Sequence, residues 1–598
     1  MIIAPTRLAL IRAGIVVAVV AVLAVEVLSL FDALHRVSVA VLWLLGLAFA
    51  VAALRRARPA WRPFWRDLGR LERSMVVALG GFFLVDLVIA VVAPPNNFDS
   101  QTYHLPKIEH WVAHGNVDFY PTIADRQLAM APGAEYLLLH LRLLTGGDSL
   151  YNLVQLAAGV GGALIASRIT AQLGGARRAQ LVAALVFGSA PMVLLEATST
   201  QTDLVVALWV GTVATLVLDE LHRRTSWPAT LLIAAAAGLT LLTKATGLLA
   251  AGPLLAVWCV AQVRRGAVRG VLGGLAVVAG MALLSGPYLW RVQTTYENPL
   301  GPDHLRDSIS MQRHDPAAVL VNALRITETA LQTPLGPVGS GAIKGVAGLL
   351  GVDPSDRDIT YWGTTYPYRS WPPDEDRVSL PVQGALVLLG AAVLLFRRGG
   401  PRLYAAVFWV AVLAYVVTVK WQPWGNRLIL FLLLLGAPLA ALWIDALLAN
   451  RRRVVSWTMT GVLAAGALAG AAAVSVGWPR RLVGQDNIFT TPELEQRFVR
   501  RPQWQQDYVT AAAAMRAAGA HRIGLLQGYN TWEYPWWVLL PGRDIVPLQS
   551  LQPDLPSAPI DSVDAVLCLD PPKGCAFYLP PSWPGGTAGT VTWAIRPR

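Results

Sequence analysis

The chain has 598 residues, of which 55% are hydrophobic and 14% are charged, and its formal net charge is +12. Soluble domains carry roughly 25% charged residues, so this composition excludes an ordinary soluble globular protein. The basic residues lie in short stretches between apolar runs, which is typical of the cytoplasmic loops of membrane proteins and does not indicate a nucleic-acid partner.

The apolar runs predict an α-helical polytopic membrane protein. Several reach eighteen residues or more, the length of a helix that crosses a bilayer. The first run is too long for a signal peptide and lacks a clear cleavage site, so we expect it to remain as a span. We expect about thirteen spans of this kind, at residues 8–31, 37–54, 75–93, 150–172, 181–196, 204–220, 228–242, 247–263, 270–289, 382–396, 403–419, 428–448 and 454–476.

Arginines give the expected orientation of these spans. A dense basic stretch separates the second span from the third, and such stretches are enriched on the cytoplasmic side. It comprises Arg55, Arg56, Arg58, Arg62, Arg66, Arg70 and Arg73. The N-terminus is then cytoplasmic, and large outer loops are expected at 95–148 and 291–380. The expected location is the plasma (inner) membrane.

Composition changes near residue 478, where charged residues, prolines and tryptophans become more frequent. We expect a membrane domain over 1–477 and a small extracytoplasmic α/β domain over 478–598. A helix near 507–518 and strands near 521–526, 544–548 and 564–569 are the elements predicted there. Cys568 and Cys575 can form a disulfide if this domain lies outside the cytoplasm. The cysteines have no zinc-ligand spacing.

A short amphipathic helix is predicted from His104 to Trp111 in the first outer loop. Its aromatic and basic residues suit the membrane interface. In this interpretation Glu109 and His110 lie on a solvated face of the helix.

Polar residues gather at four junctions between expected spans and the outer side, at 96–104, 198–203, 243–246 and 420–427. The inner junctions carry arginine and lysine, which topology explains. Polar groups at membrane depth are costly unless they serve a purpose. The asymmetry therefore predicts an active site on the outer face.

A sugar transfer on that face needs a lipid-linked donor, because nucleotide sugars are not available outside the cytoplasm. The leaving lipid phosphate gains negative charge in the transition state, and cations stabilise it. Lys244 and Arg427 are the candidate ligands of the donor phosphate. Asp99 is the candidate general base for the acceptor hydroxyl, and Asp203 is the second candidate.

Further contacts to the acceptor or its loop are expected from Tyr103, His104 and Arg126, the last in a loop that could fold over the site. Structural alternatives remain open for the main candidates. Asp99 and Asp203 could cap helices. Lys244 could extend to the interface, and Arg427 could belong to an aromatic belt.

The chain resembles the GT-C superfamily of integral membrane glycosyltransferases, nearest to the protein O-mannosyltransferase and lipid A aminoarabinose-transferase-like group. The resemblance covers about residues 75–444. It is carried by Asn97-Phe-Asp-Ser-Gln-Thr-Tyr-His104, Ser199-Thr-Gln-Thr-Asp203, Leu242-Thr-Lys-Ala-Thr-Gly247 and Trp421-Gln-Pro-Trp-Gly-Asn-Arg427.

The resemblance implies that an acidic residue of the first outer loop, here Asp99, acts as base or metal ligand, and that basic residues, here Lys244 and Arg427, bind the lipid phosphate. Many relatives carry Asp-Glu where this chain has Asp99-Ser-Gln. Because the second acid is missing, we expect no metal and no other cofactor.

The expected activity is transfer of a hexosyl or pentosyl group from a polyprenyl-phosphate donor to a hydroxyl of a glycan, lipid or protein, in contact with membrane lipids. Two alternatives remain. A polymerase or ligase of lipid-linked polysaccharide would use a lipid-diphosphate oligosaccharide. The other alternative is a secondary transporter, although the sequence shows no internal repeat that would relate two halves of the chain. A purely structural scaffold would tolerate Asp99→Asn.

Overall fold

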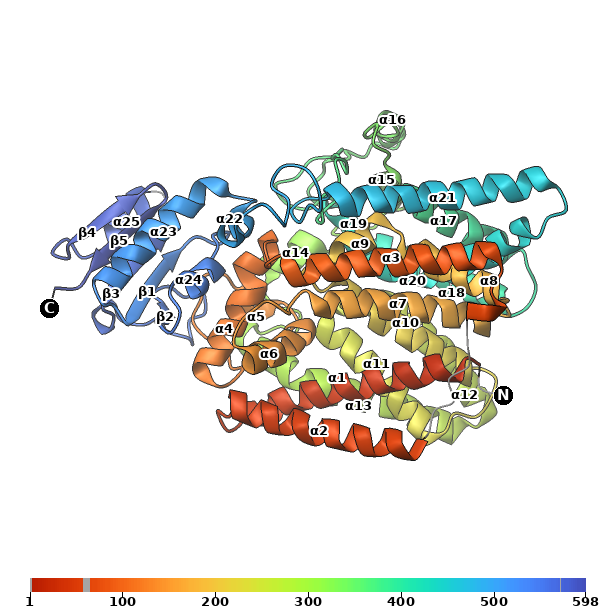
Figure 1. Cartoon of the computed structure of the whole chain (residues 1–598), viewed down its shortest axis with the longest axis horizontal. Helices are drawn as coiled ribbons and strands as arrows, with labels where there is room; N and C mark the ends of the chain where they lie inside the picture. The colour runs from red at the N-terminus through yellow and green to blue at the C-terminus, as the bar shows by residue number, and fades with distance from the viewer. Residues whose placement is uncertain (1–2, 58–64, 570–571, 598) are drawn as a thin grey trace.

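The computed structural model describes residues 3–57, 65–569 and 572–597. Long helices up to Val476 form a bundle, and a small α/β domain sits at one end of it (Figure 1). The N-terminus lies at the opposite end of the bundle (Figure 1). We call the end that carries the α/β domain the domain end.

Each expected span corresponds to a helix or a pair of helices. The span expected at 181–196 is broken, because α8 and α9 meet at an angle of 68° where Pro191 begins the second helix. The bundle helices are α1 (Pro5–Ser29), α2 (Arg36–Ala57), α3 (Arg70–Val92), α7 (Leu153–Gln172), α8 (Arg177–Gly188), α9 (Pro191–Ala197), α10 (Asp203–Glu220), α11 (Trp227–Thr243), α12 (Leu248–Arg265), α13 (Ala267–Tyr296), α17 (Pro381–Leu395), α18 (Gly400–Thr418), α20 (Leu430–Leu448) and α21 (Arg453–Val476).

Length and composition support fewer crossings than the thirteen expected spans. Among the described residues, eight helices are long and apolar enough to cross a membrane, or nine if the bent pair is one span. Residues 36–48, α11 and α17 are shorter apolar helices. Two of the arginines in the predicted cytoplasmic loop, Arg58 and Arg62, lie outside the described residues.

The centre of the bundle is formed by α10 and α20, which are buried over most of their length. Close helix approach depends on small residues. At Gly390 of α17, an added Cβ would lie 2.6 Å from the Cα of Ala440 in α20. Outer helices instead expose apolar side chains, among them Leu44, Leu275 and Leu468. This arrangement fits a bundle surrounded by lipid.

The first outer loop folds into η2 (Ser100–His104), a π-helical turn, then α4 (Leu105–His114), α5 (Arg126–Ala129) and α6 (Gly133–Thr145). The prediction of a solvated interfacial helix is wrong. In α4 the side chains of Glu109 and His110 are buried. Arg142 donates to Glu109 from Nε at 2.8 Å. His110 Nε2 lies 2.6 Å from Glu533 of the α/β domain. The polar face is buried because ionic partners satisfy it.

The second outer loop contains α14 (Asp303–Ile309), α15 (Pro316–Leu331) and α16 (Ser340–Leu349). It begins later than expected, since α13 continues to Tyr296. Two short turns lie at the domain end. The turn η3 (Ala245–Gly247) follows α11, and α19 (Gly425–Leu428) precedes α20.

The α/β domain has a five-stranded sheet of order β2-β1-β3-β5-β4. The three predicted strands are parallel, and β5 pairs antiparallel with β3. Cys568 and Cys575 form a disulfide. The elements are α22 (Glu493–Phe498), α23 (Pro502–Ala517), β1 (Arg522–Gln527), α24 (Tyr534–Leu539), β2 (Asp544–Pro547), β3 (Ala565–Leu569), α25 (Pro572–Tyr578), β4 (Gly585–Ala588) and β5 (Val591–Ile595).

A buried carboxylate fastens the α/β domain to the first outer loop. Besides its contact to His110, Glu533 accepts hydrogen bonds from Gln127 at 2.8 Å and Gln527 at 2.7 Å. The backbone N–H of Glu533 donates to the carbonyl of Gln101, two residues after Asp99. The domain therefore packs directly beside the predicted catalytic segment.

Candidate functional site

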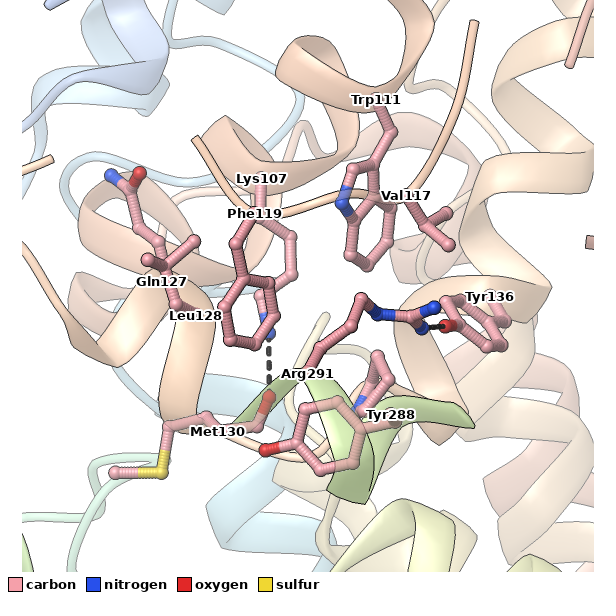
Figure 2. Close-up of a pocket in the computed structure, with 11 residues that line it drawn as sticks. Lys107, Trp111, Val117, Phe119, Gln127, Leu128, Met130, Tyr136, Tyr288 and Arg291 are labelled. Carbon is pink, nitrogen blue, oxygen red and sulfur yellow. Dashed lines mark hydrogen bonds between the residues drawn. The ribbon is translucent and has the colours of Figure 1, made fainter. Parts of the chain in front are cut away.

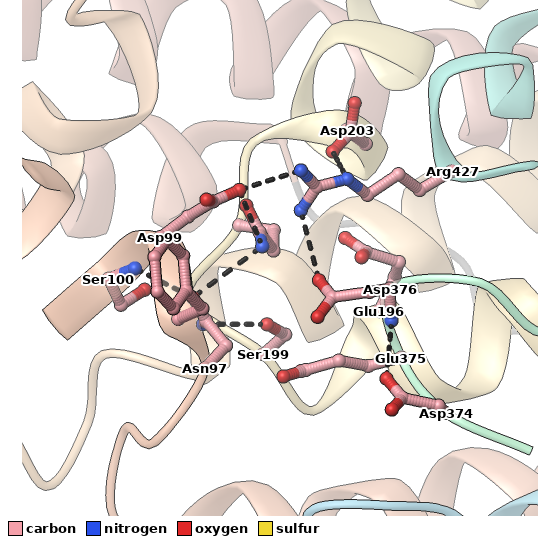
Figure 3. Close-up of polar contacts among 12 residues, drawn as sticks. Asn97, Asp99, Ser100, Glu196, Ser199, Asp203, Asp374, Glu375, Asp376 and Arg427 are labelled. Atoms are coloured by element: carbon pink, nitrogen blue, oxygen red, sulfur yellow. Dashed lines mark hydrogen bonds and ion pairs between the residues drawn. The ribbon is translucent and has the colours of Figure 1, made fainter. Parts of the chain in front are cut away.

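Three of the four polar segments predicted from the sequence meet around Asp99 and Arg427 (Figure 3), and Lys244 of the fourth pairs with Asp203. Asn97 Nδ2 donates to Ser199 Oγ and to Thr200 Oγ1, both at 3.1 Å. Gln201 Nε2 donates to Asp99 Oδ2 at 3.2 Å. The loop after α3 and the loop before α10 are therefore joined by side-chain hydrogen bonds, which hold Asp99 in place.

Arg427 lies at the centre of the site and faces three carboxylates (Figure 3). Its Nη2 donates to Asp99 Oδ2 at 2.6 Å, and its Nη1 lies 3.4 Å from Asp376 Oδ1. Its Nε lies 4.0 Å from Asp203 Oδ2. The guanidinium thus acts as the common counter-ion of acids from three different segments.

The turn that carries Arg427 is held by its neighbour Asn426. Asn426 Nδ2 donates to the carbonyls of Thr329 at 3.1 Å, Arg377 at 3.0 Å and Val378 at 3.2 Å. These contacts tie α19 to α15 and to the loop before α17. The position of the guanidinium is therefore fixed by the backbone around it.

Lys244 and Asp203 form an ion pair of 2.6 Å between Nζ and Oδ1. Asp203 is the first residue of α10 and follows the N-cap residue Thr202. The Asp203 side chain is 2% exposed, whereas that of Lys244 is 29% exposed. Lys244 therefore has one side in the ion pair and another open to an incoming anion.

The charges around Asp99 determine its protonation state. Burial by itself raises the pKa of Asp99, but the charges of Arg427 foremost, and of His104 and Arg126, outweigh it and hold the pKa well below its usual value. The carboxylate is therefore ionised throughout the neutral range.

Tyr103 and His104 lie beside Asp99 on η2. Tyr103 is hydrogen-bonded to Asp99, and burial together with that charge raises the pKa of Tyr103. His104 Nδ1 lies 2.7 Å from Oε1 of the buried Glu135. Lys107 donates to the same oxygen at 3.0 Å. Glu135, which the sequence did not single out, orients the histidine.

Arg126 differs from the other cations near Asp99. Its guanidinium lies over the Tyr103 ring at 5.1 Å and over the Tyr529 ring at 4.6 Å. Its Nη2 donates to the Tyr529 carbonyl and to Asn530 Oδ1. Within the described part of the chain no carboxylate forms an ion pair with it. Arg126 is thus a charged group held in place by neutral and aromatic partners.

The structure adds an acidic segment that sequence reasoning missed, Asp374-Glu-Asp376. Arg500 Nη2 contacts all three, at 2.9 Å from Asp374 Oδ1, 3.1 Å from Glu375 Oε1 and 3.2 Å from Asp376 Oδ2. Arg480 pairs with Glu375. The sequence pattern that could have identified this segment is three consecutive acidic residues in an outer loop, directly before an expected span.

A small pocket is lined in part by residues of α4 (Figure 2). Lys107, Trp111, Phe119, Tyr288 and Arg291 are among the residues that line it. Lys107 Nζ donates to the carbonyl of Met130 at 2.9 Å, and Arg291 donates to Tyr136 at 2.9 Å. Lys107 and Arg291, the two cations in its lining, are each already paired, so we assign the pocket a structural part in supporting the first outer loop.

The composition of the site bears on metal binding. Its carboxylates are paired with Arg427, Lys244, Arg480 and Arg500. Among the described residues, no three histidine, cysteine or acidic side chains are placed to hold a metal ion. The arrangement can hold an anion by its cations and remove a proton by an ionised carboxylate.

Comparisons with known proteins identify the fold of this chain. A model of a domain of unknown function, DUF8201, matches residues 8–300. No curated protein matches the chain. ArnT from Cupriavidus metallidurans in the apo state is similar over 88% of this chain and 98% of its own, with 15% identity and a TM-score of 0.52.

ArnT bound to undecaprenyl phosphate is similar over 87% of this chain and 97% of its own, with 13% identity and a TM-score of 0.49. The oligosaccharyltransferase AglB from Archaeoglobus fulgidus, in complex with an inhibitory peptide and a dolichol-phosphate, has 13% identity over 84% of this chain and 70% of its own, and a TM-score of 0.41. The likeness to apo ArnT shows that the chain has the GT-C fold, as its sequence resemblance implied.

Proposed function

We propose that this protein is a membrane glycosyltransferase that moves a sugar from a polyprenyl-phosphate-linked donor to an acceptor hydroxyl on the extracytoplasmic face. The observation that carries the proposal is the convergence of Asp99, Asp203, Lys244 and Arg427 at one end of a GT-C bundle. ArnT, whose apo form has this fold, has also been solved with undecaprenyl phosphate bound.

The donor phosphate would be held by Lys244 and Arg427. Both pair with carboxylates in the structure, so a phosphate has to compete with Asp203 and Asp99 for them. Arg126 has no carboxylate partner among the described residues and adds a third positive charge near Asp99. When the bond from the anomeric carbon to the phosphate oxygen breaks, the electron pair stays on that oxygen, and these cations stabilise it.

Asp99 is the catalytic carboxylate that we propose as general base. It is ionised, but its bond to Arg427 lowers its pKa and so makes it a weak base in the resting site. When Arg427 turns toward the donor phosphate, Asp99 loses that bond and its proton affinity rises. The acceptor proton then moves to Asp99 as the acceptor oxygen bonds to the anomeric carbon. A single displacement inverts that centre.

The chemistry of this donor set supports a transfer that needs no metal ion, because arginine and lysine already supply the positive charge. We propose a location in the plasma (inner) membrane, with the N-terminus in the cytoplasm and the α/β domain outside. The disulfide supports this placement, since disulfides persist in oxidising compartments.

The test is consumption of radiolabelled polyprenyl-phosphate pentoses and hexoses by the purified protein, with glycan, lipid and peptide acceptors. We expect one donor to be used, with inversion at the anomeric carbon, and Asp99→Asn to reduce transfer at least about 100-fold. Asp118→Asn, an exposed aspartate of the same outer loop, is the matched control. If no lipid-phosphate sugar is bound or consumed, the proposal is wrong. Use of a lipid-diphosphate oligosaccharide instead would identify a polymerase or ligase.

A further inference from the structure

The acidic segment before α17 is held rigidly against the site. The N–H of Asp376 donates to Asp374 Oδ1 at 3.0 Å, which closes a tight turn. The N–H of Glu375 donates to the carbonyl of Trp478 at 3.0 Å. Asn426 binds the carbonyl of Arg377, the next residue. The segment is therefore fixed to α19 on one side and to the end of α21 on the other.

The three acids of this segment share Arg500 but differ in their other contacts. Asp374 closes the turn and binds Arg500. Glu375 is fully buried against Arg480. Asp376 faces Arg427, the central cation of the site (Figure 3). Of the three, Asp376 is the acid whose position serves the active site directly.

Asp376 is also the most accessible carboxylate on Arg427. Its side chain is 25% exposed, compared with 12% for Asp99 and 2% for Asp203. Its contacts to Arg427 and Arg500 are 3.4 Å and 3.2 Å long, compared with 2.6 Å between Arg427 and Asp99. A carboxylate has about four acceptor positions. Asp376 can therefore accept hydrogen bonds from an incoming molecule.

We propose that Asp376 is the acceptor-binding carboxylate of this site, and that the acceptor is a carbohydrate whose second hydroxyl, next to the attacking one, donates a hydrogen bond to it. The inference rests on the proposed function and names its acceptor class. Asp99 and Asp376 bind the two adjacent terminal nitrogens of one guanidinium. They can therefore receive two hydroxyls on neighbouring carbons of one sugar ring.

An acceptor with a single hydroxyl would use this site poorly. A threonine side chain or a fatty alcohol presents its hydroxyl to Asp99 and offers no second hydroxyl to the remaining acceptor positions of Asp376. A site built to bond a substrate hydroxyl discriminates strongly against an analogue that lacks it, because its polar group is left unpaired. The geometry thus favours a glycan over a peptide or a simple lipid alcohol.

The test compares the wild-type protein and Asp376→Asn, each with a complete acceptor and with an acceptor that lacks one hydroxyl. Octyl glycosides serve as acceptors, beside analogues in which the hydroxyl next to the attacking one is replaced by hydrogen. With the wild-type protein, we expect deoxygenation to lower kcat/KM for the acceptor on the order of 10- to 100-fold, the range for a hydrogen bond to a charged group. With Asp376→Asn, we expect deoxygenation to change it less than about threefold. Asp376→Glu should restore part of the difference.

Controls separate this inference from the proposed function. Asp358→Asn changes an exposed aspartate of the same outer loop and should behave as wild type. The donor KM should stay the same or fall in Asp376→Asn, because Arg427 then faces one carboxylate fewer. Should that variant not fold, the wild-type deoxygenation series and a comparison with octanol and a threonine peptide remain as tests.

Three results would contradict the inference. The first is a deoxygenation effect of the same size in wild type and Asp376→Asn. The second is a deoxygenation effect below about threefold in wild type. The third is equally efficient transfer to octanol or to the peptide. A wild-type protein that consumes no donor would instead remove the proposed function, and the inference with it.

Discussion

Asp99 and Arg427 are 328 positions apart in the chain and are joined by a hydrogen bond of 2.6 Å between Oδ2 and Nη2. The two residues were predicted for opposite tasks, one to take a proton and the other to hold a phosphate. Their contact means that each restrains the position of the other. It also means that any change of one alters the charge and position of the other.

Replacing Asp99 by asparagine should reduce transfer by about 100- to 10,000-fold, the contribution of general base catalysis. The amide cannot take the proton. Donor affinity should be kept or should rise, because Arg427 is freed from its strongest carboxylate. Steady-state kinetics with separate donor and acceptor titrations measure both. An unchanged kcat would exclude Asp99 as the base.

Arg427→Lys should raise the donor KM by roughly 10- to 100-fold, the range for losing hydrogen bonds between charged groups. Lysine keeps the charge but cannot form a fork that reaches the phosphate and several carboxylates together. Arg357→Lys, at an exposed position of the second outer loop, is the matched control. Equal donor KM values in both variants would contradict a phosphate contact.

Acceptor affinity should fall in acid because of Asp376. Burial raises the pKa of this carboxyl to about 6, although Arg500 and Arg427 oppose the rise, while Glu375 and Asp374 support it. Glu196 of α9 also interacts with it. A group with this pKa is mainly ionised at pH 7 and mainly protonated at pH 5. The acceptor KM should therefore rise about tenfold from pH 7 to pH 5.

The donor KM supplies the internal control for this pH series. It should change little over the same range, since the pKa of Asp99 lies well below it. In Asp376→Asn the acceptor KM should be high and nearly independent of pH. An acceptor KM that stays constant in the wild-type protein would show that Asp376 does not contact the acceptor.

Glu533→Gln should loosen the α/β domain from the first outer loop. The change removes the charge that faces His110 and disturbs a buried group with bonds to Gln127 and Gln527. Leaving a buried polar group without its hydrogen-bond partner typically costs about 1–3 kcal/mol. Thermal unfolding followed by tryptophan fluorescence would measure the loss. Glu493→Gln, whose side chain is 68% exposed, should leave the transition in place.

Reduction of the disulfide between Cys568 and Cys575 should destabilise the α/β domain by about 2–3 kcal/mol, the range for a short closed loop. Membrane-impermeant maleimide should label this pair in intact cells only after treatment with a reductant. Labelling that needs permeabilised cells would place the domain in the cytoplasm, against the proposed topology.

Much of the site could be predicted because its chemistry is locally encoded. The junction residues Asp99, Asp203, Lys244 and Arg427 stand out as polar groups at the ends of apolar runs, where such groups are rare. Topology then places the ends of alternate helices on one side of the membrane. The structure brings these four residues into contact, although their catalytic roles stay predictions.

The solvated face predicted for α4 failed for a physical reason. Glu109 and His110 have the spacing and polarity of exposed residues, but their partners Arg142 and Glu533 come from α6 and from the α/β domain. No pattern within α4 contains that information. A buried ionic group is identified only when its counter-ion is known.

By itself, the sequence determined the membrane class, the helical runs, three strands of the C-terminal domain and the four polar segments, because hydropathy and periodicity are local properties. Only the tertiary structure decided how the charges are paired. Asp376 reaches Arg427 through a turn fixed by Asn426 and Arg500. Such pairing depends on distances between segments far apart in the chain, and packing alone sets those distances.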